Sequence, residues 1–155
     1  FKNNDLVLII KENIKLLKET NNKIKINLKN NSNKILFICD NEQLNRVFFN
    51  LIKNSIESIN EKYVNNPNFS SKIDIEILKE RDYIEFIIID NGKGFEGFSN
   101  NIKDILNPYF TTKKQGSGLG LSIVNKIIND HNGTIDFIPL NDGAKIIIRF
   151  VKNEH

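Results

Sequence analysis

The chain contains 155 residues, the size of one ordinary domain with its own hydrophobic core. Its 22 basic and 19 acidic residues give a net charge of +3, which is too weak a bias to indicate a nucleic-acid-binding protein. The single cysteine, Cys39, excludes an internal disulfide and a cysteine-built zinc site, and two histidines are too few for a histidine-rich metal site.

The first part of the chain alternates between helix and strand patterns. Asp5 is a candidate N-cap for a helix whose apolar residues follow at near-helical spacing. Residues 23–28 alternate strictly and predict a half-buried strand, and residues 35–38 predict a short apolar strand. Asp40 or Asn41 is expected to cap a second helix. The apolar stripe of that helix has a helical period and consists of Leu44, Val47, Phe48, Leu51, Ile52 and Ile59.

The middle of the chain predicts a β-hairpin. A polar connector over residues 61–71, which contains Pro67, separates the hairpin from the second helix. Residues 73–77 alternate as a strand should, residues 81–82 form the turn, and residues 83–89 return as a more buried strand.

The last part of the chain mixes glycine-rich segments with regular elements. Residues 90–97 contain three glycines, and residues 108–120 show no regular period, with a weak helix pattern at 101–106 between them. Gly133 is expected to end the last helix in the left-handed conformation. The remaining elements are a helix at 121–130 and strands at 135–138 and 144–151.

This order of elements predicts the α+β class. Hairpins lie beside helices along the chain, and neither an internal repeat nor a long linker divides it. We therefore expect a single domain over residues 1–155, in which helices cover one face of a mostly antiparallel sheet.

Three groups of residues could carry chemistry, and the first lies on the second predicted helix. Asn50, Asn54 and Glu57 follow one another at i, i+4 and i+7 and therefore share one face of that helix. Amide and carboxylate oxygens suit a hard cation such as Mg²⁺, which also binds substrate phosphates. Polar residues on a surface helix are equally explained by solvation alone.

The second group follows the more buried hairpin strand. Asp90 ends this strand, and Gly92 and Gly94 come directly after it. A carboxylate held in this way can accept a hydrogen bond from an exocyclic amine such as that of adenine, while the glycines permit close backbone approach. The alternative is an ordinary Asp-Asn-Gly turn.

The third group is a glycine run that leads into the last helix. In residues 116–122 the glycines leave backbone N–H groups free to face phosphate oxygens at a helix N-terminus. Residues 111–114 add hydroxyl groups and positive charge just upstream. The run matches neither the nucleotide P-loop nor a dinucleotide-binding βαβ unit, and a flexible loop would explain it too.

Taken together and in this order, the motifs resemble those of sensor histidine kinases over essentially the whole chain. Finer features around Cys39-Asp40 and Asn54 are most similar to the nitrogen-regulation type of these kinases. The matching segments are residues 50–55 for the N box, 90–95 for the first glycine box, 108–113 for the F box, 116–121 for the second glycine box, and the tail at 130–134 with Gly143 and Ala144.

The resemblance implies a fold and a set of binding residues. The fold is a two-layer α/β sandwich of the Bergerat type, shared with gyrase-type, mismatch-repair and chaperone ATPases, with ATP and Mg²⁺ as ligands. Asn54, assisted by Asn50, would coordinate Mg²⁺, and Asp90 would accept the adenine amine. Asn50 and Lys113 are the only candidates for a catalytic role. The other implied nucleotide-binding residues are Gly92, Gly94, Phe110, Thr111, Thr112, Lys113, Gly116, Gly118, Leu119 and Gly120.

Some residues depart from the family pattern. Asn50 stands where the ATPase relatives carry the glutamate that activates water, which favours phosphoryl transfer to a protein nucleophile over hydrolysis. Glu57 stands where many of the kinases carry a basic residue, and Ala144 where a threonine is common. His131 precedes a helix-ending glycine and is interpreted as structural, and Cys39 as a small buried residue.

The resemblance implies that this chain is the ATP-binding catalytic domain of a two-component sensor histidine kinase of bacterial origin. It would donate the γ-phosphate of ATP to a histidine on a dimerisation domain that this chain lacks, and a response regulator receiver domain would be a further partner. We expect the isolated chain to bind ATP without phosphorylating itself. The alternatives are an ATPase of the same superfamily and a nucleotide-sensing module without transfer activity.

Several features bear on the parent protein. The chain has no methionine, no secretory signal and no apolar run long enough to span a bilayer. The missing methionine indicates a piece of a longer protein. The resemblance implies that this piece is a cytoplasmic domain, that the parent protein is a homodimer anchored in the inner membrane, and that it has no nucleic-acid partner.

Overall fold

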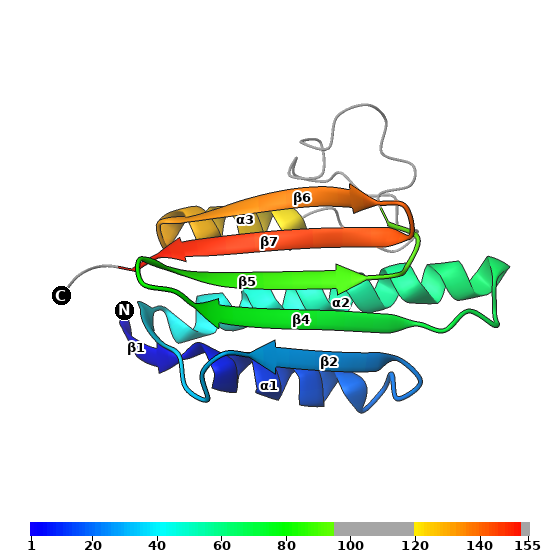
Figure 1. The fold of residues 1–155 in the computed structure, drawn as a ribbon, viewed down its shortest axis with the longest axis horizontal. Coiled ribbons are helices and arrows are strands. Elements are labelled where there is room, and N and C mark those ends of the chain that lie inside the picture. Colours follow the sequence, from blue (N-terminus) through cyan, green and yellow to red (C-terminus); the bar gives the residue numbers. More distant parts are fainter. Residues whose placement is uncertain (95–119, 153–155) are drawn as a thin grey trace.

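Helices lie on one face of a mixed five-stranded sheet in the computed structural model, which describes residues 1–94 and 120–152 (Figure 1). The sheet order is β2-β4-β5-β7-β6; β2 pairs with β4 in parallel and the other three pairings are antiparallel. The expected two-layer α+β fold is therefore confirmed. The helices are α1 (Leu6–Lys18), α2 (Asn41–Asn65) and α3 (Gly120–Asp130), and the strands of this sheet are β2 (Lys25–Asn30), β4 (Lys72–Lys79), β5 (Tyr83–Asp90), β6 (Gly133–Leu140) and β7 (Gly143–Val151).

The core lies between the sheet and the helices because alternate strand residues point inward. On β4 the buried residues are Ile73, Ile75 and Ile77. On β5 they include Phe86, whose ring lies 4.9 Å from that of Phe48 on α2. The apolar stripe predicted for α2 is buried along its whole length, so the sequence period correctly identified the face that packs on the sheet.

Predicted capping residues begin the first two helices. Asp5 accepts hydrogen bonds from the backbone N–H groups of Val7 and Ile35, both at 3.1 Å, and so joins the start of α1 to the segment before β3 (Leu36–Cys39). Asp40 accepts the N–H of Gln43 at 3.1 Å at the start of α2. Each carboxylate satisfies a donor that the first turn of a helix leaves without an intrahelical partner.

A two-stranded sheet at the N-terminus was not predicted. β1 (Lys2–Asp5) pairs antiparallel with β3, separately from the main sheet. Its residues are all polar, so they carry no hydrophobic alternation, and the strand forms through backbone pairing with its partner.

Two local predictions were wrong. The polar connector predicted from residue 61 is helical as far as Asn65: Glu61 and Lys62 are good helix formers, and the ring of Tyr63 packs 4.5 Å from that of Phe69. The left-handed residue after α3 is Asn132, with φ of 57°, and not Gly133, which begins β6. Asparagine tolerates this conformation, while Gly133 is needed for packing: a Cβ there would lie 2.9 Å from Cγ2 of Ile128. The weak helix pattern at 101–106 lies outside the described residues.

Candidate functional site

One flank of α2 carries the predicted metal ligands. Asn50, Asn54 and Glu57 are half-buried, next to the fully buried stripe that packs on the sheet. The start of α3 faces this flank, because a Cβ built on Gly120 would lie 4.0 Å from Oδ1 of Asn50. Lys53 Nζ lies 3.9 Å from a carboxylate oxygen of Glu57. The structure therefore brings part of the predicted N box to the predicted phosphate-binding end of α3.

Asp90 ends β5 with its carboxyl group almost fully enclosed. The residue is 6% exposed, and its Oδ1 accepts the backbone N–H of Gly92 at 2.9 Å. Burial raises the pKa of this carboxyl group, while hydrogen bonds from Gly92 and from the Ser55 hydroxyl, together with the positive charge of Lys62, act in the opposite direction. Ser55 follows Asn54 directly on α2, so the predicted base-recognition residue lies against the predicted N box.

Gly92 lets the turn after β5 lie directly on α2. A Cβ at Gly92 would be 2.5 Å from Oγ of Ser58 and 2.7 Å from its carbonyl carbon, closer than side chains tolerate. The N–H of Lys93 donates to the carbonyl of Ser58 at 3.3 Å in the same region. Gly92 is thus required for packing of the turn on the helix.

Two further glycines lie against backbone atoms of the facing turn where this turn meets the β6–β7 turn. Gly94 has φ of +70° and Gly143 has φ of +126°, both in the region that side chains rarely adopt. A Cβ on Gly143 would lie 1.8 Å from the carbonyl oxygen of Asp90, and one on Gly94 would lie 2.6 Å from the carbonyl oxygen of Gly143. Ala144 pairs with Asp90 across β5 and β7, so the position where a threonine is common lies beside the buried carboxylate.

Ser55, Lys62 and Gly143 support this site and were not predicted to do so from the sequence. Lys62 donates to the carbonyl of Asn91 at 2.8 Å and pairs with Asp142 at 2.6 Å, so it connects α2 to both turns. Of these three, Gly143 and Ser55 lie in matching segments of the sequence, the tail and the N box. The contacts of Ser55 and Lys62 join segments that are far apart along the chain and carry no local pattern.

Much of the predicted nucleotide-binding segment lies outside the described residues. Of the residues predicted downstream of the first glycine box, Gly120 alone is described, at the start of α3. The others are Phe110, Thr111, Thr112, Lys113, Gly116, Gly118 and Leu119.

The described residues that could hold Mg²⁺ are the two asparagines. Within residues 1–94 and 120–152, no group of three or more histidine, cysteine or acidic side chains is placed to hold a metal ion. Amide oxygens of Asn50 and Asn54 fit a magnesium ion that takes its remaining ligands from phosphates and water, as Mg²⁺ commonly does.

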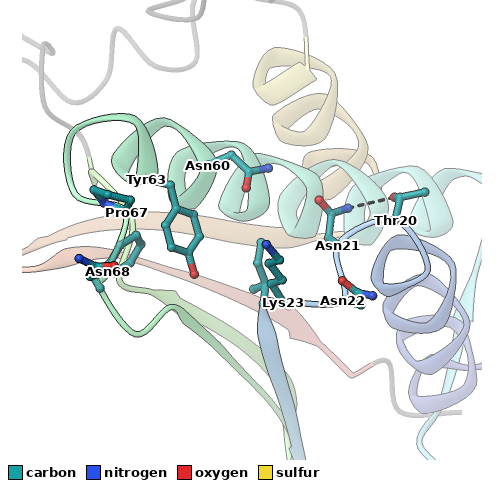
Figure 2. Close-up of a pocket in the computed structure, with 10 residues that line it drawn as sticks. Thr20, Asn21, Asn22, Lys23, Asn60, Tyr63, Pro67 and Asn68 are labelled. Atoms are coloured by element: carbon teal, nitrogen blue, oxygen red, sulfur yellow. Dashed lines mark hydrogen bonds between the residues drawn. The ribbon is translucent and has the colours of Figure 1, made fainter.

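A separate pocket lies on the opposite flank of α2 (Figure 2). It has a volume of about 570 Å³ and lies between α2, the α1–β2 loop and the segment before β4. None of the predicted site residues lines it. Its lining consists of Thr20, Asn21, Asn22, Lys23, Ile24, Asn60, Tyr63, Pro67, Asn68 and Phe69.

His131 and Cys39 have the structural roles expected from the sequence. Nε2 of His131 accepts the N–H of Asp40 at 3.1 Å, so Nδ1 carries the proton that it shares with the carbonyl of Ile127 at 2.7 Å. The ring is buried and stacks on Phe1 at 4.6 Å, which joins the end of α3 to the start of α2 and to the N-terminus. Cys39 is buried, and burial raises the pKa of its thiol.

Comparison with known proteins supports the resemblance found in the motifs. Residues 39–154 match the family model described as histidine kinase-, DNA gyrase B- and HSP90-like ATPase. A protein of Rickettsia felis named sensor histidine kinase NtrY-like is 35% identical over 151 residues, which cover 97% of this chain and 24% of that protein. The chain thus spans about a quarter of the length of the curated relatives it matches.

Solved structures give the same result. The nucleotide-free catalytic domain of the histidine kinase ThkA superposes with a TM-score of 0.82 and 26% identity, covering 98% of this chain and 97% of that one. A structure of ThkA in complex with the response regulator TrrA matches with a TM-score of 0.79 and 25% identity, covering 99% of this chain and 42% of that one.

Among the described residues, no helix combines the length and hydrophobicity that a membrane span requires.

Proposed function

The chain belongs to the family of histidine kinase-, DNA gyrase B- and HSP90-like ATPases, and on that premise we propose that it is the ATP-binding catalytic domain of a sensor histidine kinase. One observation carries the proposal: the buried carboxylate of Asp90 lies against Ser55, the residue after Asn54 in the predicted N box. The residues to which we assign adenine and Mg²⁺ therefore belong to one region of the fold, at the end of β5 and on α2.

In this proposal each described residue has a distinct task. Asp90 accepts a hydrogen bond from the adenine amine, with its carboxylate already oriented by the N–H of Gly92 at 2.9 Å. Asn54 and Asn50 supply amide oxygens to Mg²⁺, which when bound would neutralise charge on the phosphates. The start of α3 at Gly120 directs backbone N–H groups toward phosphate oxygens.

The reaction we propose is transfer of the γ-phosphate to a histidine of a separate domain, and not hydrolysis. Asn50 occupies the position from which a glutamate would activate water, and a neutral amide cannot serve as a base at neutral pH. Catalysis would then rest on positioning and on charge neutralisation.

The partners follow from the same proposal. The histidine would belong to a dimerisation domain of the parent protein, a homodimer, and the phosphate would pass on to a response regulator. The ThkA complex with its response regulator supports this second partner. We further propose that the parent protein holds this domain at the cytoplasmic side of the inner membrane.

Calorimetry with Mg²⁺ and a non-hydrolysable ATP analogue tests the proposal. We expect saturable binding by the wild-type chain and a loss of at least about tenfold in Asp90→Ala, since a hydrogen bond to a buried carboxylate contributes about 1.5–3 kcal/mol. Asn54→Ala should weaken the binding that depends on Mg²⁺ and leave binding of ADP without metal largely intact. Asp136→Ala, on the exposed side of β6, is the matched control and should bind normally.

Two results would contradict the proposal. One is the absence of any uptake by a well-folded wild-type chain. The other is unchanged affinity in Asp90→Ala, which would show that the base lies elsewhere.

A further inference from the structure

Lys62 lies where three segments around Asp90 meet. Its Nζ donates to the carbonyl of Asn91, next to Asp90, at 2.8 Å, and pairs with Asp142 of the β6–β7 turn at 2.6 Å. The ammonium group also lies 4.5 Å from the centre of the Phe69 ring. The Lys62 side chain is 20% exposed and that of Asp142 is 73% exposed, so the cation is the enclosed member of the pair.

The side chain of Asn91 holds the turn after Asp90 from the other side. Oδ1 of Asn91 accepts the N–H of Lys72 at 2.8 Å, and its Nδ2 donates to the carbonyl of Ser70 at 2.7 Å. The carbonyl of Asn91 and its side chain therefore bind to different parts of the molecule. With both fixed, the backbone after Asp90 cannot shift without breaking several hydrogen bonds.

Lys62 is also the charged side chain that acts on the Asp90 carboxyl group within the described residues. The residues paired with Asp90 are apolar: Ile73 on β4 and Ala144 on β7. From α2, Ser55 contributes a hydroxyl hydrogen bond and Lys62 a positive charge. Burial disfavours the ionised carboxyl group, and Lys62 favours it.

We propose that Lys62 is a positioning residue for base selection, which holds Asp90 and the turn after it in place so that the site accepts a 6-aminopurine and rejects a 6-oxopurine. This inference rests on the proposed function. A carboxylate accepts a hydrogen bond from the 6-amino group of adenine but repels the 6-oxo group of hypoxanthine. A protonated carboxyl group can instead donate to that oxygen, so the positive charge of Lys62, together with the hydrogen bonds from Gly92 and Ser55, also favours discrimination.

The test measures affinity for ADP and for IDP, its 6-oxopurine counterpart, by calorimetry between pH 5 and pH 8. In Lys62→Met, the methionine keeps an unbranched apolar side chain but removes the charge. We expect the ratio of ADP to IDP affinity to fall about tenfold at neutral pH. In Lys62→Met, the pH below which the protein no longer prefers ADP to IDP should rise. Lys62→Arg should keep a ratio near that of the wild type, and Lys11→Met, at an exposed position of α1, should leave it unchanged.

Asp142→Asn separates this role from a purely structural one. Removing the carboxylate leaves the charge of Lys62 less compensated, so the pH below which discrimination is lost should fall, opposite to the change in Lys62→Met. If the charge of Lys62 had no part in discrimination, both variants would shift the pH profile in the same direction or not at all. The Asp142→Asn result also stands if Lys62→Met does not fold.

The outcomes distinguish this inference from the proposed function. Equal loss of ADP and IDP affinity in Lys62→Met, with the pH profile unmoved, would overturn the selection role while the nucleotide site stands. A wild-type chain that binds neither nucleotide would instead overturn the proposed function.

Discussion

At the scale of single residues, burial of Asp90 has a consequence for stability. Because burial raises the pKa of Asp90, the native state holds this proton more tightly than the unfolded chain does. As pH rises from the ordinary value of 3.8 toward the raised native value, the unfolded chain ionises first and the free energy of unfolding falls. The stability that the bound proton contributes is present at low pH and is lost above the native pKa.

We expect the free energy of unfolding of Asp90→Asn not to fall in this way as pH rises. Denaturant unfolding of the nucleotide-free chain at a series of pH values should show wild-type stability declining relative to the variant over the window above pH 3.8. Parallel curves for the two proteins across this window would show that the carboxyl group titrates alike in the folded and unfolded states.

Gly143 gives a second residue-scale prediction. Gly143→Ala would place a Cβ 1.8 Å from the carbonyl oxygen of Asp90, at a backbone conformation that alanine rarely adopts. We expect a loss of at least about 2 kcal/mol in the free energy of unfolding, measured in urea.

Gly120→Ala is the matched control for stability. Among the described residues, the nearest atom to its Cβ would be Oδ1 of Asn50 at 4.0 Å, and alanine favours a helix. Its free energy of unfolding should therefore be unchanged or higher. A Gly143→Ala protein as stable as Gly120→Ala would contradict the interlocked arrangement of the two turns.

At the scale of elements, Asp5 joins α1 to the segment before β3. Asp5→Ala removes the acceptor of two backbone N–H groups, those of Val7 and Ile35, and should lower the free energy of unfolding by about 1–2 kcal/mol. Asp5→Asn keeps an oxygen acceptor and should stay within about 0.5 kcal/mol of the wild type. Equal effects of the two substitutions in urea unfolding would point to charge, and not hydrogen bonding, as the contribution of Asp5.

Elements with a strong local pattern were predictable, and those without one were not. The apolar stripe of α2 and its cap at Asp40 identified that helix, and alternation identified β4 and β5. β1 was missed because its polar residues gain a strand only through pairing with β3. The extension of α2 to Asn65 was missed because the buried apolar stripe ends at Ile59.

At the scale of the whole molecule, the sequence predicted the fold and indicated candidate site residues, but it did not predict the contacts that hold them. Asn50 and Asp90 became candidates because motif spacing is local. Lys62 and Asp142 are 80 positions apart, and only the sheet order that sets β7 beside β5 brings them together. Such long-range contacts have no periodic pattern, so physical reasoning from a single sequence cannot locate them.

The stacking of Phe1 on His131 couples the first residue of the chain mechanically to the helices. His131 bridges the end of α3 and the first turn of α2 through hydrogen bonds to Ile127 and Asp40. A force applied to Phe1 would therefore be transmitted directly to the junction of these helices, in addition to the backbone pairs of β1 with β3. In single-molecule pulling, attachment at this end should load the helical layer before the five-stranded sheet.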